Sequence, residues 1–251
     1  MTQIQFKNRW VWVTGAGQGI GRHLACAFTE LGANVIGLDR HFPQDTYPYR
    51  TQVLDISQPE DVENLCQQLL AVQPRLDILV NVAGILCLGE LETLSTEDWR
   101  RCFEVNVSGA FYLLRQLIPV FKRQRSGTLV TVASNAAHVP RVGMAAYGAS
   151  KAALVSLSHS VGLELAPFGV RSNVVSPGST YTPMLRSMLE DSEAANRLIQ
   201  GLPEQYKLGI PLGKIATEED ISNTILFLAS DLAGHITLQD IVVDGGATLG
   251  A

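Results

Sequence analysis

The chain has 251 residues, of which 46% are hydrophobic and 17% are charged, and its formal net charge is −5. This length fits one large domain or two small ones, and because no stretch resembles a linker we expect a single domain over residues 1–251. The negative charge argues against nucleic acid or an anionic membrane surface as a partner.

The same sequence argues against membrane insertion, secretion and a metal site. No apolar run approaches the length of a membrane span, and the polar residues 1–9 lack the apolar core of a signal peptide. The four cysteines show no C-x-x-C spacing, which favours free thiols in a reducing compartment over a metal site or disulfides. We therefore expect a cytoplasmic protein without a bound metal. The cysteines are Cys26, Cys66, Cys87 and Cys102.

The first elements in chain order form a dinucleotide-binding pattern. An apolar strand over residues 9–14 runs into a glycine-rich turn, and a helix with apolar residues at helical spacing follows. Glycines allow the backbone to approach a pyrophosphate, whose charge the helix amino terminus stabilises. The spacing is G-x-x-x-G-x-G rather than the common G-x-G-x-x-G, and glycine also serves ordinary turns. We predict cofactor contacts at Gly15, Gln18, Gly19 and Ile20.

The second strand, over residues 34–38, leads to an acid that predicts which nicotinamide cofactor binds. Asp39 stands where a carboxylate would accept hydrogen bonds from the adenosine ribose. It would repel a 2′-phosphate, so Asp39 favours NAD over NADP. Arg40 follows directly and would accommodate that phosphate, and the alternative for Asp39 is a solvated turn acid.

Two further strands bring polar and small residues to the same edge. The strand over residues 51–55 ends at Asp55 and Ile56, which would line an adenine pocket, although Asp55 would equally cap the helix that begins at residues 57–60. The strand over residues 76–80 runs into a turn of small residues. Because open parallel sheets bind ligands at the carboxyl ends of their strands, we expect cofactor contacts there. The turn residues concerned are Asn81, Ala83 and Gly84.

A long helix is predicted from Thr96, where acids suit the helix dipole, toward Phe121. Asn106 lies in the middle of it among apolar residues, and a buried amide needs a hydrogen-bond partner. Asn106 either satisfies a neighbouring backbone group or fixes a water or a backbone kink beside the catalytic lysine.

The fifth strand, over residues 127–133, ends at a candidate catalytic group. Ser134 stands at the strand end, and Tyr147 and Lys151 share one face of the helix that follows. A phenol titrates near ~10, which is too high for a base at neutral pH. An ammonium beside it favours the phenolate, so we predict that Lys151 lowers the pKa of Tyr147 and makes it a general base.

The last third of the chain completes the sheet. A sixth strand over residues 170–176 leads into a turn with Gly178, Thr180 and Thr182, which we predict to contact the cofactor, and a seventh strand covers residues 240–243. Residues 183–212 fit the core poorly, which suggests a lid over the site. The elements predict an α/β fold of one domain, a Rossmann-type doubly wound sheet of seven parallel strands with helices on both faces.

These motifs together resemble the short-chain dehydrogenases/reductases over nearly the whole chain. The residues that carry the resemblance are Thr14 to Gly21, Asn81 to Gly84, Asn106, Ser134, Tyr147, Lys151, and Pro177 with Gly178. One departure is Val82, where the family commonly has a second asparagine. The resemblance implies catalysis by Tyr147, Lys151, Ser134 and Asn106, with Tyr147 and Lys151 also contacting the cofactor.

Within that family, three stretches resemble the dihydrodiol dehydrogenases of catecholate siderophore biosynthesis. They are residues 136–144, residues 205–216 and the tail from residue 235. The resemblance implies NAD-dependent oxidation of a small carboxylic acid to an aromatic catechol by a cytoplasmic homo-oligomer, commonly a tetramer. Hydride would leave C3 of the dihydrodiol ring, while Tyr147 takes the proton of the C3 hydroxyl and Ser134 orients the oxygen of that hydroxyl.

An acidic substrate requires a cation near the site. Arg141 lies between Ser134 and Tyr147 and is the candidate, because a guanidinium binds a carboxylate through two parallel hydrogen bonds. The alternative is a surface arginine on a loop. Apolar walls around the ring would come from Leu86, Met144 and Met184, whose ordinary role is core filling.

Two other functions are compatible with this pattern. One is a dehydrogenase or reductase for another carbonyl, such as a 3-oxoacyl thioester or a sugar, although Asp39 and the acidic balance count against a carrier-protein reductase. The other is a non-catalytic NAD-binding protein. Such a protein would be free to lose Tyr147 or Lys151, and both are present with Ser134.

Overall fold

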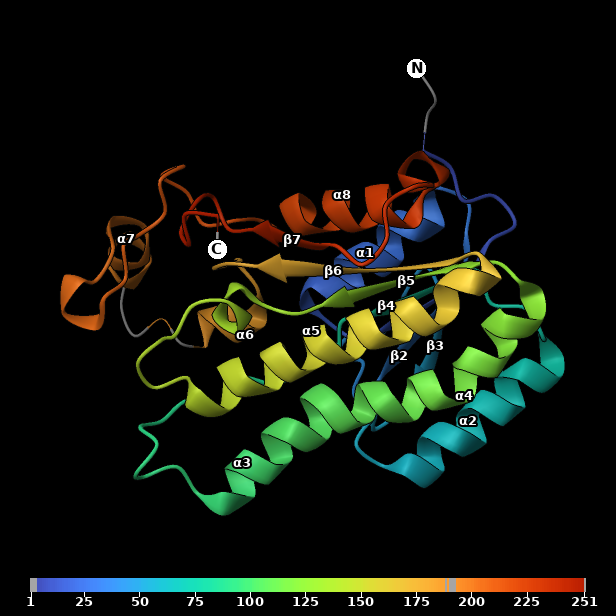
Figure 1. Ribbon diagram of the computed structural model, residues 1–251, viewed down its shortest axis with the longest axis horizontal. Coiled ribbons are helices and arrows are strands. Elements are labelled where there is room, and N and C mark those ends of the chain that lie inside the picture. Colours follow the sequence, from blue (N-terminus) through green and yellow to red (C-terminus); the bar gives the residue numbers. More distant parts are fainter. Residues whose placement is uncertain (1–3, 188, 190–192, 251) are drawn as a thin grey trace.

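The computed structural model describes residues 4–187, 189 and 193–250. Within them, seven strands form one parallel sheet in the order β3-β2-β1-β4-β5-β6-β7. This confirms the predicted doubly wound α/β fold, in which the chain reverses direction across the sheet at β1 and β4 (Figure 1). The strands are β1 Trp10–Thr14, β2 Asn34–Asp39, β3 Arg50–Val53, β4 Ile78–Asn81, β5 Gly127–Val132, β6 Val170–Pro177 and β7 Asp240–Val243.

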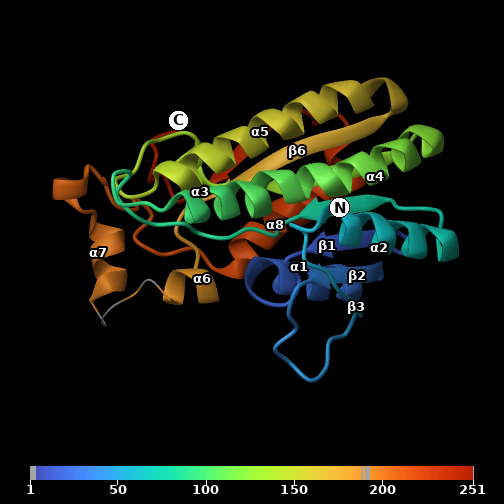
Figure 2. The same ribbon diagram turned by 90° about the horizontal axis from the view of Figure 1, so that it is seen from below.

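Helices cover both faces of the sheet (Figures 1 and 2). On one face, α1 Gly19–Glu30 and α8 Glu218–Ala229 pack Phe28 and Ile225 against the strands. On the other face, the apolar sides of three helices pack around Leu117 and Leu165. These helices are α2 Pro59–Val72, α4 Gly109–Gln124 and α5 Ala145–Leu165. Burial on both sides explains why the strands read as nearly continuous apolar runs.

The predicted helix from Thr96 toward Phe121 is interrupted in its middle. The α-helix α3 Thr96–Phe103 is followed by one π-helical turn, Glu104–Ser108, before α4 begins. Asn106 lies in this turn and is 1% exposed. Its side chain bonds the backbone of Ile85 outside the helix, so the wider turn serves a contact that helical periodicity could not reveal.

Strand boundaries differ from the predictions by up to two residues. The third strand ends at Val53 rather than at Asp55, because the Asp55 carboxylate folds back to accept hydrogen bonds from the backbone and the hydroxyl of Ser57. That contact is a local turn before α2, whose N-cap residue is Gln58. The alternative in which Asp55 caps the helix is therefore wrong.

The predicted lid region contains short helices that extend beyond the body of the sheet (Figure 1). They are α6 Pro183–Arg186, α7 Ala194–Gln200 and a 3-10 turn, Pro203–Gln205. Residues 188 and 190–192 of the predicted lid lie outside the described residues. Further 3-10 turns are Asn135–Ala137, Ala166–Phe168 and Asp231–Ala233. No helix in the described part of the chain is both long and apolar enough to cross a bilayer.

Candidate active site

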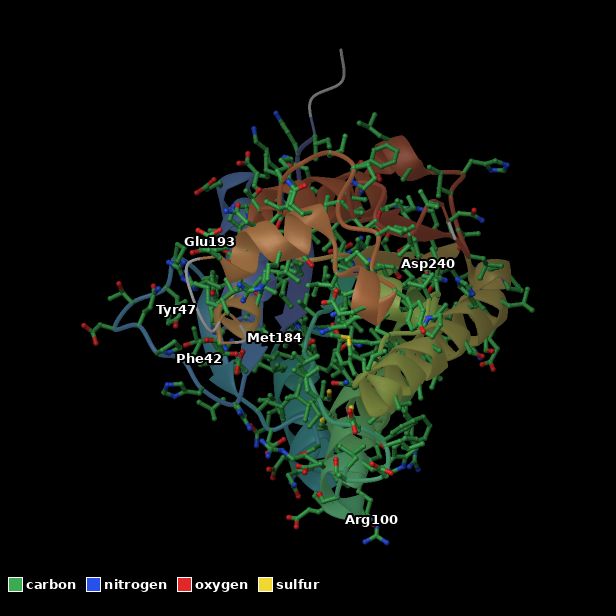
Figure 3. All side chains as sticks on the ribbon, turned by 90° about the vertical axis from the view of Figure 1, so that its left-hand side faces the viewer. Phe42, Tyr47, Arg100, Met184, Glu193 and Asp240 are labelled. Carbon is green, nitrogen blue, oxygen red and sulfur yellow. The ribbon has the colours of Figure 1, made fainter. Side chains whose placement is uncertain are left out.

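A large cavity of about 1670 Å³ opens at the carboxyl edge of the sheet. It is lined by residues that follow β1, β2, β4, β5 and β6, as expected for the edge at which open parallel sheets bind ligands. Its volume exceeds the range of roughly 300–1,000 Å³ that suits one drug-sized ligand, so a dinucleotide and a small substrate fit together. Figure 3 views the molecule from this end, with Met184 near the middle of the view and Arg100 at its lower edge.

The glycine turn forms one end of the cavity and suits a diphosphate. Gly15, Gln18, Gly19 and Ile20 all line it. Helix α1 begins here with no side-chain cap and no acid in its first turn, so its free N–H groups and positive dipole end are left for an anion. Gly21 has no room for a side chain, because a Cβ there would lie 2.1 Å from the Gly15 carbonyl oxygen. The donors present therefore fit a dinucleotide.

Asp39 faces this end of the cavity from the end of β2. Its carboxylate accepts hydrogen bonds from the backbone N–H groups of Gly17, at 2.8 Å, and His41, at 3.1 Å. The acid is thus held at the turn rather than solvated freely. Arg40, Asp55 and Ile56 line the cavity beside it.

Most of the other predicted cofactor residues also line the cavity. These residues are Ala83, Gly84, Gly178, Thr180 and Thr182. Asn81 does not, because its side chain lies 4% exposed beneath the turn and accepts a hydrogen bond from Thr14 Oγ1 at 3.0 Å. The same hydroxyl accepts from the backbone N–H groups of Val82 and Ala83. Asn81 therefore shapes the turn that follows β4 and makes no direct side-chain contact with the cavity.

Asn106 also lies behind the cavity wall. Its amide accepts a hydrogen bond from the Ile85 N–H at 2.8 Å and donates to the Ile85 carbonyl at 3.0 Å and to Ser150 Oγ at 2.9 Å. The Ser150 hydroxyl in turn donates to the Tyr147 carbonyl. Asn106 thus satisfies a neighbouring backbone group, as the first alternative predicts, and it lies in a π-helical turn, an irregularity of the backbone of the kind that the second alternative predicts. A Cβ at Gly84 would lie 3.1 Å from Asn106 Oδ1 and 3.2 Å from Lys151 Nζ, so glycine leaves room for both.

Ser134, Tyr147 and Lys151 converge on the cavity from β5 and α5. Lys151 is 3% exposed, donates to the Val132 carbonyl at 3.1 Å, and places Nζ 5.8 Å from the centroid of the Tyr147 ring. Ser134 is close enough to the Tyr147 side chain to lower its pKa. A phenol, an ammonium and a hydroxyl therefore share one wall of the cavity.

The predicted effect of Lys151 on the phenol is wrong for this structure. Burial raises the pKa of Tyr147 to about 12, and Ser134 acts in the opposite direction. Burial lowers the pKa of Lys151 to about 8. Desolvation of the phenolate therefore dominates, and Lys151, whose Nζ lies 5.8 Å from the ring centroid, does not lower the pKa of Tyr147.

The predicted substrate residues also line the cavity; they are Leu86, Arg141, Met144 and Met184, and Met184 is 39% exposed. Arg141 lies near Asp244, at the end beside the turn after β7. Burial lowers the pKa of Arg141, which therefore is not a freely solvated surface arginine. His138, in contrast, lies 2.9 Å from Asp240 in a contact outside the cavity.

Sequence reasoning missed Lys207, which lines the same end of the cavity. Its position follows from a loop that folds back between Gly201 and Gly209, both with positive φ. The two glycines were the available signal, since they mark a tight loop, but they do not indicate which way the lysine points.

Comparisons with known proteins identify the family of this chain. The family described as Enoyl-(Acyl carrier protein) reductase matches residues 15–248. The chain is 60% identical to 2,3-dihydro-2,3-dihydroxybenzoate dehydrogenase of Escherichia coli, over 99% of this chain and 100% of that protein. It is 38% identical to the vibriobactin-specific 2,3-dihydro-2,3-dihydroxybenzoate dehydrogenase of Vibrio cholerae, over 99% of both chains.

A solved structure extends the comparison to the fold. A putative NAD(P)-dependent gluconate 5-dehydrogenase from Beutenbergia cavernae, with bound NADP, superimposes with a TM-score of 0.89. It is 32% identical and covers 99% of this chain and 100% of that one. On this fold, this site and these relatives, the chain belongs to the short-chain dehydrogenase/reductase family.

Proposed function

We propose that this protein oxidises 2,3-dihydro-2,3-dihydroxybenzoate to 2,3-dihydroxybenzoate with NAD, in catecholate siderophore biosynthesis. The observation that carries the proposal is the 60% identity, over the full length of both chains, to the Escherichia coli dehydrogenase of that name. The candidate site supports it, because a proton acceptor and an arginine line one cavity with room for a dinucleotide.

The family uses a nicotinamide cofactor, and the proposal specifies NAD. Bound at the glycine turn, it would supply the hydride acceptor for an alcohol oxidation. The residues that would hold it are those of the turn, Asp39 at the adenosine ribose, and Asp55 and Ile56 beside the adenine. Asp39 supports NAD because its carboxylate is held at the turn by two backbone N–H groups and would repel a 2′-phosphate.

Proton transfer is assigned to the phenol. Tyr147 would take the proton of the C3 hydroxyl while Ser134, whose hydroxyl acts on the phenol, would orient the substrate oxygen. With a pKa raised by burial to about 12, Tyr147 needs further positive charge to release its own proton. Lys151 contributes one such charge from the next turn of α5, and the oxidised nicotinamide ring would contribute another.

Asn106 is proposed to act through position. Its amide joins Ile85 in the loop after β4 to Ser150 on α5, and so fixes the position of the helix that carries Tyr147 and Lys151.

The ketone that forms when the alcohol is oxidised would tautomerise to an aromatic catechol, which makes the reaction favourable without any driving force from the protein. Catalysis then rests on positioning and proton transfer.

Arg141 is proposed to bind the substrate carboxylate, with Leu86, Met144 and Met184 as the apolar walls around the ring. Residues 183–212 are proposed to act as the lid of the single domain. Met184, Leu185, Leu198 and Lys207 support this, because they line the cavity from that segment.

The proposed assembly and compartment are a homotetramer in the cytoplasm. The family resemblance supports the tetramer, and the four cysteines, all of them free, suit a reducing compartment.

Incubation of the purified protein with 2,3-dihydro-2,3-dihydroxybenzoate and either NAD or NADP tests the function. We expect NADH absorbance to rise together with the catechol product, and NAD to be strongly preferred. Rapid turnover of a 3-oxoacyl thioester or a sugar, with none of the dihydrodiol, would assign the chain to a different substrate class.

A further inference from the structure

Charged side chains of both signs line the cavity. Asp39, the last residue of β2, and Arg40 lie beside the glycine turn, whereas Arg141 and Lys207 form a cationic end near Asp244 in the turn after β7. The loop that carries Lys207 reaches that turn through a hydrogen bond from the Leu212 N–H to the Gly245 carbonyl, at 3.1 Å. The cationic end is therefore separate from the region that suits the cofactor phosphates.

The Arg141 guanidinium forms no ion pair or hydrogen bond with any residue in the described part of the chain. Asp244 is the acid that favours its charge. The Asp244 carboxylate, however, already accepts hydrogen bonds from Asn135 Nδ2, Thr248 Oγ1 and the Gly246 N–H. Burial lowers the pKa of Arg141, although the negative charge of Asp244 acts in the opposite direction. The positive charge of the guanidinium is therefore only partly balanced by its surroundings.

Lys207 is presented by a loop that closes on itself. The Leu202 N–H donates to the Lys207 carbonyl at 2.9 Å, and the Lys207 N–H donates to the Leu202 carbonyl at 3.1 Å. A Cβ at Gly201 would lie 2.6 Å from the Lys207 carbonyl oxygen, so the closed loop requires glycine there. The ammonium donates to the neutral Gln205 Oε1 at 2.8 Å and, among the described residues, has no ion-pair partner.

The two cations act on each other. Burial and, after it, the positive charge of Arg141 lower the pKa of Lys207, whereas Glu204 acts in the opposite direction. Two like charges in a partly desolvated site repel, and an anion bound between them removes that repulsion. The pair is thus arranged for a negatively charged ligand.

We propose that Lys207 is a second substrate-binding residue, which together with Arg141 holds the carboxylate of an aromatic acid between two cations. The identity of that acid rests on the proposed function. Arg141 supplies two parallel N–H donors, and Lys207 adds a third donor from the side of the loop. The pair selects acids over neutral diols, and it links substrate binding to the position of the loop over residues 201–209.

Calorimetric binding to the full-length protein at saturating NAD tests this, with 2,3-dihydroxybenzoate and its neutral amide, 2,3-dihydroxybenzamide, as the matched ligands. Lys207→Gln should weaken binding of the acid about tenfold and change binding of the amide less than about twofold. Lys207→Arg should recover most of the lost affinity. Lys214→Gln is the control, because Lys214 pairs with Asp220 at 3.1 Å outside the cavity and should leave both affinities unchanged.

Thermal unfolding gives a second readout. Without ligand, Lys207→Gln relieves the repulsion with Arg141, so its Tm should equal or exceed that of the wild type, while the rise in Tm on adding the acid should be smaller. Unchanged acid affinity in Lys207→Gln, or equal weakening of acid and amide, would overturn the proposal. A wild type that binds the acid through both cations but does not oxidise the dihydrodiol would overturn the proposed function and support the role of Lys207.

Discussion

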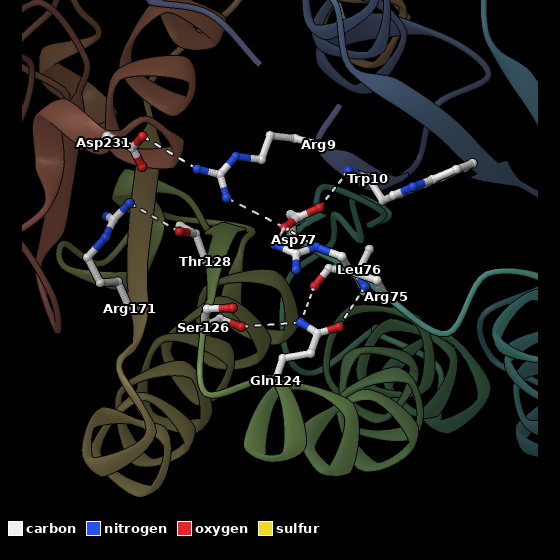
Figure 4. A network of polar contacts seen from close by, with 10 residues as sticks. All are labelled: Arg9, Trp10, Arg75, Leu76, Asp77, Gln124, Ser126, Thr128, Arg171 and Asp231. Atoms are coloured by element: carbon white, nitrogen blue, oxygen red, sulfur yellow. Dashed lines mark hydrogen bonds and ion pairs between the residues drawn. The ribbon is translucent and has the colours of Figure 1, made fainter. Parts of the chain in front are cut away.

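The two edges of the sheet carry similar polar side chains but use them differently. At the amino edge, the Asp77 carboxylate accepts a hydrogen bond from the Trp10 N–H at 2.8 Å and from Arg75 at 2.6 Å, and it lies 3.5 Å from Arg9 (Figure 4). At the carboxyl edge, Lys151 and Arg141 have no carboxylate partner among the described residues.

The amino edge satisfies its own polar atoms in several further ways. Gln124 accepts from the Leu76 N–H and donates to the Leu76 carbonyl, and Arg171 donates to Thr128 Oγ1 and to the Ser230 carbonyl (Figure 4). The contrast teaches that one edge pairs its charged groups within the fold, whereas the other leaves the Lys151 and Arg141 cations without a paired carboxylate among the described residues. Substitutions at the two edges should therefore affect different properties.

The largest effect should come from the phenol at the carboxyl edge. Tyr147→Phe should lower turnover by about a thousandfold or more, because it removes the proton acceptor and leaves the packing of the ring intact. Binding of NAD and Tm should stay close to wild type. Steady-state kinetics and calorimetry check both, with Tyr181→Phe, outside the main cavity, as the matched control. Retained turnover would remove the role of Tyr147 as base.

Lys151, at the carboxyl edge, should make the stability of the protein depend on pH. Its pKa is about 8 in the folded protein and near its ordinary value of 10.5 in the unfolded chain, so between these values the unfolded state binds more protons and stability rises with pH. Lys151→Met should lack this rise, which amounts to about 3 kcal/mol. The free energy of unfolding of Lys151→Met, relative to that of the wild type, should therefore fall between pH 7 and pH 10.5.

Urea unfolding of wild type and Lys151→Met at the two pH values measures this difference. Tyrosines that titrate at high pH are present in both proteins, so their contribution largely cancels. A difference in unfolding free energy that stays constant with pH would mean that Lys151 does not titrate in the buried site.

At the amino edge, Asp77→Ala should change stability and not chemistry. Asp77 is 4% exposed, and its removal leaves the buried Trp10 N–H without an acceptor, which should cost about 2 kcal/mol of unfolding free energy. The kcat of the folded fraction should match wild type. Asp231→Ala, whose side chain is 95% exposed, is the control and should have little effect on either quantity. A large fall in kcat would contradict the division between the edges.

The smallest effect should be a change in cofactor preference. Asp39→Ala should shift the ratio of kcat/KM for NAD and NADP about tenfold toward NADP, because a carboxylate no longer repels the 2′-phosphate, while Arg40 remains available. Kinetics with both cofactors measures the ratio, and Asp45→Ala on the neighbouring exposed loop is the comparison. An unchanged ratio would show that Asp39 does not face the ribose.

Much of the carboxyl edge was predictable from sequence, because short-range patterns carry it. Apolar runs predict buried parallel strands, and a strand followed by a glycine turn and a helix predicts where a dinucleotide binds. The spacing of Tyr147 and Lys151 places both on one face of α5, as observed. The seven strands and their order around β1 follow the same rules.

The errors have physical causes. The side chain of Asn81 points beneath the turn after β4, toward Thr14, and no local pattern specifies that direction. The π-helical turn at Asn106 depends on a partner, Ile85, that lies 21 residues away. The pKa of Tyr147 depends on burial by elements that are distant in sequence, so proximity to Lys151 predicted the wrong direction.

The sequence by itself determined the parallel sheet, the glycine turn and the face shared by Tyr147 and Lys151, because hydrophobic periodicity and helical spacing act over a few residues. The tertiary structure alone decided that Arg141 and Lys207, which are 66 positions apart, meet at one end of a cavity. Electrostatic interaction depends on distance and desolvation, and both exist only once the chain has folded.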